Sequence, residues 1–167
     1  WVGAACGFII MVAPRYFRYE HCDHHTWTQV TGRDPEQIPL PKTLGSYLWY
    51  LSSVPYWWAK CKEITSHAAG HLSDADKVFV PKIEYSAVIW EARVILAVYV
   101  AVVVAMLTFD WAGPLYYWFI PVLLGEPVMR FVRMTEHVGM PPVSNMRANT
   151  RTNLVSVVWQ WLCWNMN

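Results

Sequence analysis

Charged residues are scarce in this 167-residue chain: Asp, Glu, Lys and Arg make up 15% of it, against about a quarter of a typical soluble domain. The net charge is only +1, so the composition indicates no nucleic-acid partner. None of the four cysteines forms a C-x-x-C pair, and we interpret them as free thiols. These shortages argue against a soluble, nucleic-acid-binding or disulfide-stabilised protein.

Apolar residues take the place of the missing charge. Hydrophobic residues make up 55% of the chain and aromatic residues 16%, with 11 tryptophans. Trp and Tyr are enriched where a protein meets the headgroup layer of a membrane. We therefore predict an all-α integral membrane protein that forms a single domain over residues 1–167. Because the chain opens in an apolar run without Met and stops with no helix stop signal, we expect it to be incomplete at both ends.

A hairpin across the membrane is the clearest structural prediction. Residues 94–109 hold no charge and, extended upstream to Ile89, reach the length of a spanning helix. Asp110 to Pro114 predicts a tight turn, and the apolar segment 115–129 runs back. The turn has no Lys or Arg, whereas both flanks of the hairpin are basic. The positive-inside rule therefore places both ends of the hairpin on the cytoplasmic side.

Three other segments are predicted outside this hairpin. Residues 1–13 are apolar but too short to span, and form either the end of a longer helix or an interfacial segment. Residues 44–59 predict a helix that lies in the membrane interface. The polar segment 60–82 predicts an exposed cytoplasmic stretch, although His67 and His71 at i, i+4 spacing leave a metal-binding alternative.

The strongest chemical signal is the pattern H-x-x-H-H formed by His21, His24 and His25. On a helix, positions i, i+3 and i+4 share one face, so the three imidazoles point the same way. Converging imidazoles suit iron, zinc, copper or nickel; the alternative is a histidine-rich surface turn without a metal. Arg15 and Arg18 precede the histidines, which predicts a cytoplasmic cap that carries this box beside the membrane.

Two carboxylates near the box are candidates for supporting its histidines. Asp23 lies within the box, and Asp34 follows in the proline-rich loop 31–42. A carboxylate at such a position holds a ligand histidine through its second ring nitrogen. The alternative for Asp34 is a turn with solvated carboxylates.

A fourth histidine, His137, follows the returning arm of the hairpin and stands next to Glu136. A lone histidine is more often structural. Here, however, the hairpin returns the chain to the side of the membrane that carries the box. We therefore predict that His137 is a metal ligand and that Glu136 supports it.

The segment N-T-R-T-N at residues 149–153 offers two more supporting candidates, Asn149 and Arg151. Alternatively, Thr152 or Asn153 caps a final apolar helix, by accepting hydrogen bonds from its first free N–H groups.

Together these motifs resemble the membrane-bound fatty acid desaturase and hydroxylase superfamily of histidine-box di-iron enzymes. The matching elements are the H-x-x-H-H box, the stretch from Thr28 to Glu36 that ends in D-P-E, the Arg133-x-x-Glu136-His137 segment, and N-T-R-T followed by W-N-M-N. The resemblance covers essentially the whole chain. Its pattern is nearest to the bacterial branch that includes hydrocarbon oxygenases and alkane hydroxylases.

The resemblance implies two iron ions held by three histidine boxes and an isolated ligand, with O2 as co-substrate. The three histidines described above match the second box and His137 matches the isolated ligand. The first box is expected before Trp1 and the third after Asn167, so we expect the chain by itself to be inactive. The implied reaction is desaturation or hydroxylation of a fatty acyl or alkyl chain.

The implied partners are a lipid substrate, membrane lipid and an electron donor such as ferredoxin, rubredoxin or cytochrome b5. Basic residues between Arg130 and Arg151 are expected to dock an acidic donor.

Two other functions stay open. A non-catalytic, histidine-rich membrane metal-binding protein, such as a transporter or sensor, would place ligands at mid-depth in the membrane, and residues 94–109 hold none. A zinc-dependent membrane hydrolase would need three ligands, an open position and a base.

Overall fold

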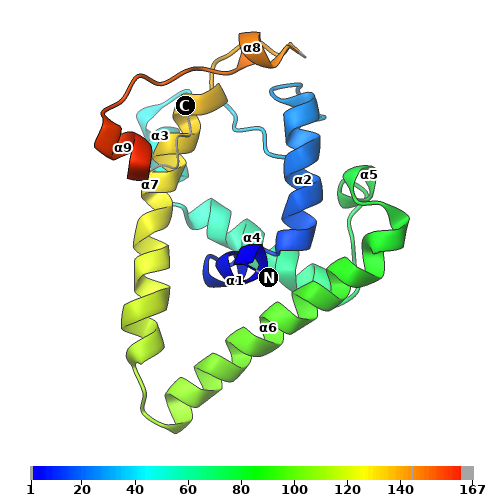
Figure 1. Cartoon of the computed structure of the whole chain (residues 1–167), viewed down its shortest axis with the longest axis vertical. Coiled ribbons are helices and arrows are strands. Elements are labelled where there is room, and N and C mark those ends of the chain that lie inside the picture. The colour runs from blue at the N-terminus through cyan, green and yellow to red at the C-terminus, as the bar shows by residue number, and fades with distance from the viewer. Residues whose placement is uncertain (1, 144, 163–167) are drawn as a thin grey trace.

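The computed structural model describes residues 2–143 and 145–162, which form helices and connecting loops without a strand (Figure 1). The elements are α1 (Val2–Ile9), α2 (Pro14–Trp27), α3 (Leu44–Leu51), α4 (Val54–Ala68), α5 (Asp76–Phe79), the short helix η1 (Lys82–Glu84), α6 (Tyr85–Thr108), the π-helical turn η2 (Leu115–Phe119), α7 (Ile120–His137), α8 (Met146–Asn149) and α9 (Val157–Leu162). The all-helical prediction is confirmed. Trp1 and the W-N-M-N end lie outside the described residues.

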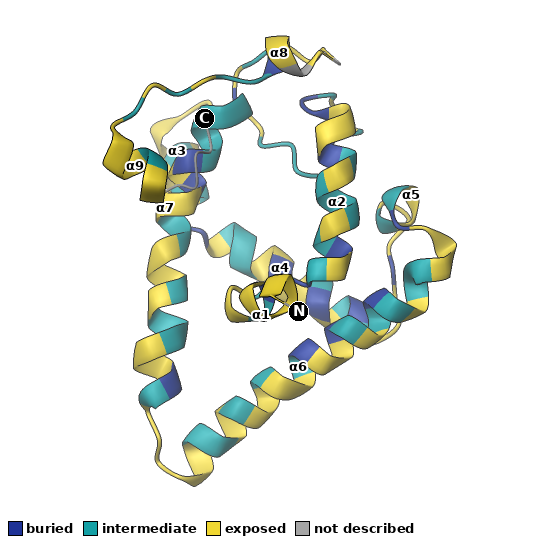
Figure 2. Ribbon diagram, in the orientation of Figure 1, coloured by how far each residue is buried: buried dark blue, intermediate teal, exposed yellow. Residues whose placement is uncertain are grey.

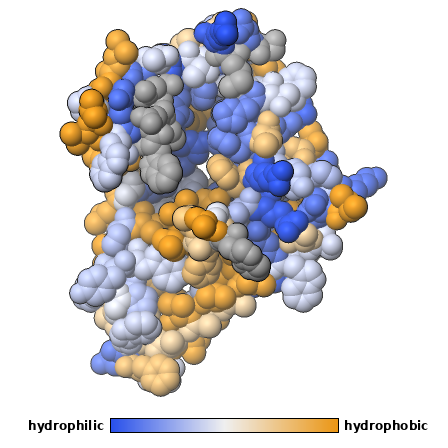
Figure 3. Space-filling view, in the orientation of Figure 1, coloured by the Kyte–Doolittle hydropathy of each residue, from blue (hydrophilic) through white to orange (hydrophobic). Residues whose placement is uncertain are grey.

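The longest helix agrees with the predicted spanning segment. Within the described part of the chain, only the stretch Lys82–Thr108 is long and apolar enough to cross a membrane. Many of its apolar side chains, Val100, Val103 and Leu107 among them, are exposed (Figure 2). Figure 3 shows hydrophobic residues gathered along α1 and α6, whereas hydrophilic ones are more frequent toward α2 and α8. An apolar helix that is exposed on most sides suits lipid surroundings.

The returning arm of the hairpin is longer than predicted. Asp110 adopts a positive φ of 50° in the turn, and η2 and α7 then continue unbroken to His137. Pro127 lies inside α7 without ending it. Figure 1 shows α6 and α7 diverging from the turn, so the end of α7 lies far from it. The path of this arm through a membrane stays a prediction.

A small core joins α2, α4 and α6. Its buried members are Ala13, Tyr16, Ile64, Leu72, Val80, Val88 and Ile95. α4 packs along α6, and α3 connects α4 to α7. The core therefore fixes the start of α2, from which the histidine box extends.

The prediction that residues 60–82 are exposed is wrong for His67. This side chain is 2% exposed, and its Nε2 lies 3.2 Å from Asp76 Oδ2. The hydroxyl of Tyr16 donates to Asp76 Oδ1 at 2.9 Å. Burial opposes ionisation of Asp76, but the hydrogen bonds from His67, Ser73 and Tyr16 outweigh it and lower its pKa to about 2. The burial arises because the ring of Tyr16 on α2 packs against His67, with ring centroids 4.7 Å apart, a contact that no pattern within 60–82 reveals. His71 is exposed.

We expect Asp76→Asn to lower the free energy of unfolding by about 1–3 kcal/mol, because it weakens hydrogen bonds made to a buried carboxylate. Chemical unfolding of the detergent-solubilised protein at pH 7 measures this. Asp74→Asn is the matched control, because that carboxylate is fully exposed and pairs only with Lys77; it should leave the unfolding curve unchanged. Equal losses in the two variants would contradict a structural role for Asp76.

Candidate metal centre

Helix α2 presents the three box histidines together. It begins with Pro14, a residue that suits the first turn of a helix because no intrahelical partner is needed there for its nitrogen. The ring centroids of His21 and His25 are 4.4 Å apart, and those of His21 and His24 are 5.6 Å apart. The predicted common face is confirmed.

Two carboxylates from the loop after α2 hold two of these rings. His24 Nδ1 lies 2.7 Å from Asp34 Oδ1, and His21 Nδ1 lies 2.8 Å from Glu36 Oε1. A carboxylate only accepts, so Nδ1 of each of these two rings carries a proton. The other ring nitrogen, Nε2, is the atom left to meet a metal; in His21 it lies 3.0 Å from His25 Nε2. Histidines that bind metals are commonly held in this way.

Asp34 also organises the loop itself. Its Oδ2 accepts from the backbone N–H of Gln29 at 2.8 Å, and its Oδ1 accepts from that of Glu36 at 2.9 Å. Burial opposes ionisation of this carboxylate, but the hydrogen bonds from His24 and the two backbone groups outweigh it and lower its pKa. Asp34 is therefore more than a solvated turn residue.

Glu36 was not among the predicted site residues. Its side chain is 6% exposed and lies between His21 and Arg133 of α7, which donates to Glu36 Oε2. Burial opposes ionisation, but the hydrogen bond from His21 and the charge of Arg133 outweigh it and lower the pKa of Glu36 to about 2. The same hydrogen bond raises the pKa of His21. The D-P-E motif was the available signal, but it does not tell which histidine each carboxylate reaches.

Helix α7 brings the fourth histidine to the box. The ring centroid of His137 lies 5.2 Å from that of His24, and its Nδ1 lies 3.2 Å from the carbonyl oxygen of Asn149. The side chain of Asn149 is fully buried and donates to the carbonyl oxygens of Thr28 and Val143, at 2.9 and 2.7 Å. Asn149 thereby ties the end of α2 to the segment that orients His137.

The other predicted supporting residues make different contacts. Asp23 forms an ion pair with Arg33. Glu136 accepts a hydrogen bond from the backbone N–H of Arg151 through its own carbonyl oxygen. In the described part of the chain, neither side chain has a hydrogen bond to a box histidine. Arg151 lines a cavity of about 370 Å³ with Tyr47, Phe131, Met134, Thr135 and Asn153.

The alternative that Thr152 or Asn153 caps the final helix is wrong. α9 begins at Val157, and the hydroxyl of Ser156 accepts from the N–H of Trp159. Asn153 instead donates to Thr135 Oγ1 at 2.8 Å.

The donor atoms are suited to a metal but do not make a complete shell. His21 Nε2 and His25 Nε2 are 3.0 Å apart, close to the separation of about 3 Å expected for two imidazoles bound at right angles to one ion at about 2.1 Å. Burial and the neighbouring histidines lower the pKa of His25, which favours the neutral, metal-binding form. Among the residues that the structure describes, no group of three or more His, Cys, Asp or Glu is placed so that it could hold a metal ion. The metal-ligand role of the four histidines stays a prediction.

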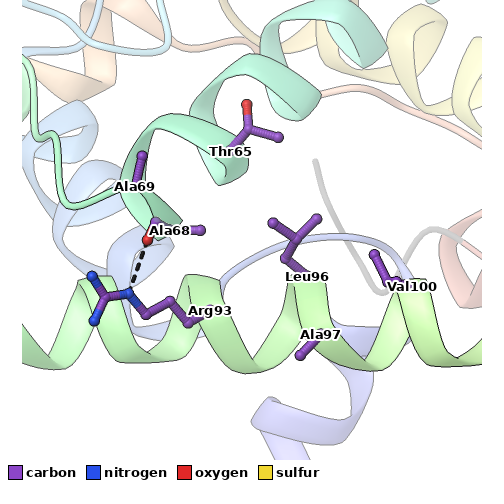
Figure 4. Close-up of a pocket in the computed structure, with 7 residues that line it drawn as sticks. All are labelled: Thr65, Ala68, Ala69, Arg93, Leu96, Ala97 and Val100. Carbon is purple, nitrogen blue, oxygen red and sulfur yellow. Dashed lines mark hydrogen bonds between the residues drawn. The ribbon is translucent and has the colours of Figure 1, made fainter.

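A larger cavity, of about 490 Å³, lies between α4 and α6 (Figure 4). It is lined by Thr65, Ala68, Ala69, Arg93, Leu96, Ala97 and Val100. Arg93 donates from Nε to the carbonyl oxygen of Ala68 at 2.9 Å. No candidate ligand lines this cavity, so it is separate from the histidine cluster.

Comparison with known families identifies one that accounts for the whole arrangement. The model of the fatty acid desaturase family matches residues 1–167. The match includes both the box on α2 and the fourth histidine at the end of α7. No curated protein and no solved structure matches the chain.

We expect Asp34→Ala to loosen the loop after α2, because the substitution removes the acceptor of the Gln29 and Glu36 amides and of His24. Hydrogen exchange of those two amides should accelerate by roughly 10- to 100-fold, equivalent to about 1–3 kcal/mol of local stability. Asp23→Ala removes a carboxylate of the same box that pairs only with Arg33, and should leave these amides protected. Unchanged exchange in Asp34→Ala would contradict the organising role of Asp34.

Proposed function

Because the chain belongs to the fatty acid desaturase family, we propose that it is part of a membrane enzyme that uses two iron ions and O2 to desaturate or hydroxylate a fatty acyl or alkyl chain. Membership of the family was predicted from the motifs and is confirmed. It supports an oxidoreductase of lipid metabolism in general. The iron, the position attacked and the choice between the two reactions belong to the proposal.

One observation carries the proposal: three of the four clustered histidines direct Nδ1 at a protein acceptor, which leaves Nε2 as the ring nitrogen that would meet a metal. The acceptors are Asp34 for His24, Glu36 for His21 and the carbonyl of Asn149 for His137. A surface turn without a metal has no need of such oriented rings, whereas a metal site does.

His21, His24, His25 and His137 would hold iron, together with histidines expected from the first and third boxes. When bound, the iron supplies the oxidation of an unactivated carbon chain by O2. Asp34, Glu36 and the carbonyl of Asn149 would orient the rings of His24, His21 and His137 through Nδ1, so that Nε2 of each would face the iron. Burial of Asp34 and Glu36 keeps these carboxylates on the rings rather than in water.

The proposed location is an integral membrane protein with the histidines on the cytoplasmic side. α6 is the apolar helix, and Figure 1 shows α2 and the end of α7 far from the turn that follows α6. The part of α6 from Val94 to Thr108 contains no His, Cys, Asp or Glu. That composition favours the enzyme over a transporter with ligands at mid-depth.

The proposed docking surface for an electron donor is smaller than the sequence indicated. Arg130 is 8% exposed and paired with Glu126, and Arg133 is paired with Glu36. Neither is free to meet a partner. Arg147, which is exposed, and the half-buried Arg151 are left as candidates for binding an acidic donor.

The proposal is tested on the full-length protein by iron analysis and by identifying oxidised lipid products in cells that express it. We expect His21→Ala and His137→Ala each to reduce product by more than about 100-fold, the upper end of the loss caused by removing mere supporting partners. Iron per protein should fall in both. His71→Ala is the control, because His71 is an exposed histidine outside the cluster; this variant should keep normal iron content and normal product.

Normal iron content and product in His21→Ala would overturn the proposal. Metal bound without any oxidised lipid would instead favour the non-catalytic metal-binding protein.

A further inference from the structure

We infer that Glu36 and Arg133 act as a pair of positioning residues that hold the histidine box of α2 at its working distance from His137 of α7. The inference rests on the proposed function, because it concerns the metal site of that function.

The pair joins parts of the chain that are distant in sequence. Glu36 and Arg133 are 97 positions apart, and both side chains are largely withdrawn from water, at 6% and 25% exposure. The two oxygens of Glu36 are divided between partners: Oε1 faces His21 Nδ1 at 2.8 Å, and Oε2 accepts from Arg133. One carboxylate therefore contacts a box histidine and the other helix at the same time.

The position of Arg133 on α7 transmits this contact to the fourth histidine. Arg133 and His137 stand at i and i+4 of one helix, so they share a face. A contact that holds Arg133 therefore holds the face that carries His137. The ring centroid of His137 lies 5.2 Å from that of His24. The contacts that run from His21 through Glu36 and Arg133 to His137 therefore end beside the same histidine box in which they begin.

Direct packing between α2 and α7 does not fix the distance between them. Figure 1 shows α2 and α7 apart along their length, with connecting segments between their ends. α2 packs on α5 and α6, and α7 packs on η2 and α3. Among the described residues, the two histidine-bearing helices are linked at the site by the Glu36–Arg133 ion pair, the hydrogen bonds of Asn149 and the edge-to-face contact between the rings of His24 and His137.

The charges make the pair sensitive to single substitutions. When one partner of a buried ion pair is removed, the other is left as an uncompensated charge, whereas removing both costs less than the two losses added together. Glu36 and Arg133 should therefore show strong coupling. Asp23, which pairs with Arg33 and does not reach α7, should not be coupled to Arg133.

The experiment measures Co²⁺ affinity of the metal-free, full-length protein in detergent, from the visible absorption of the bound ion. We expect Glu36→Gln and Arg133→Gln each to weaken binding by roughly 10- to 100-fold, the range seen when supporting partners of metal ligands are removed. The double variant should bind about as weakly as the worse single variant. Arg133→Lys should restore part of the affinity, because it returns the positive charge but not the planar guanidinium.

Arg33→Gln is the matched control. Arg33 also pairs with a carboxylate next to the box, Asp23, but this ion pair stays within α2 and its own loop. Its loss should leave Co²⁺ affinity and the absorption spectrum unchanged.

A second measurement needs no metal. Spin labels on Thr26→Cys in α2 and Val128→Cys in α7, with the native cysteines replaced, report the distance between the helices. Both positions are exposed. We expect Arg133→Gln to broaden the distance distribution and Arg33→Gln to leave it narrow.

Additive losses in the double variant, or wild-type affinity and a narrow distance distribution in Arg133→Gln, would overturn the inference and leave Glu36 as a support for His21 alone. Failure of the proposed function looks different, because the parent protein itself would then either bind no Fe²⁺ or bind it without producing oxidised lipid.

Discussion

A neutral imidazole has one N–H nitrogen and one nitrogen with a free lone pair. The site depends on which of the two ring nitrogens carries the proton. Here buried acceptors settle the matter: a carboxylate faces Nδ1 of His21 and of His24, and a backbone carbonyl faces Nδ1 of His137. With Nδ1 engaged in this way, Nε2 is the nitrogen through which such a ring would bind a metal. The loop after α2 and the segment after α7 both take the paths that put these acceptors in place.

The first half of α2 is organised by a second polar network. Tyr16 bonds to Asp76, and Lys60, 8% exposed, bonds to Glu63 at 2.8 Å and lies 4.0 Å from Glu20. Burial raises the pKa of Glu20 to about 7, although Lys60 opposes this. Because one end of α2 is anchored by this network, the box at its other end projects in a defined direction. Support for the site therefore reaches well beyond the residues that face the histidines.

The residues that the sequence did not reveal share a physical cause. Glu36 belongs to a visible D-P-E motif, but its partner Arg133 becomes apparent only when α7 folds back. His67 sits in a polar stretch that reads as exposed, and it is buried because Tyr16 and Asp76 meet it there. Arg130 reads as a docking charge, yet it pairs with Glu126 one turn earlier and lies over the ring of Tyr56. For Glu36 and His67 the deciding contact comes from packing between segments, which short-range patterns do not encode; for Arg130 the i, i+4 spacing from Glu126 was visible in the sequence, and only the contact with Tyr56 needed the fold.

The sequence by itself determined the helical, apolar character of the chain, the family, and the face on which the three box histidines lie. Those conclusions depend on composition and on spacings within single helices, which are local properties. Only the tertiary structure decided which carboxylate holds which ring, that Asn149 orients His137 through its carbonyl, and that Glu36 reaches α7. These are contacts between distant segments, and they form because buried polar groups must find partners wherever the fold places them.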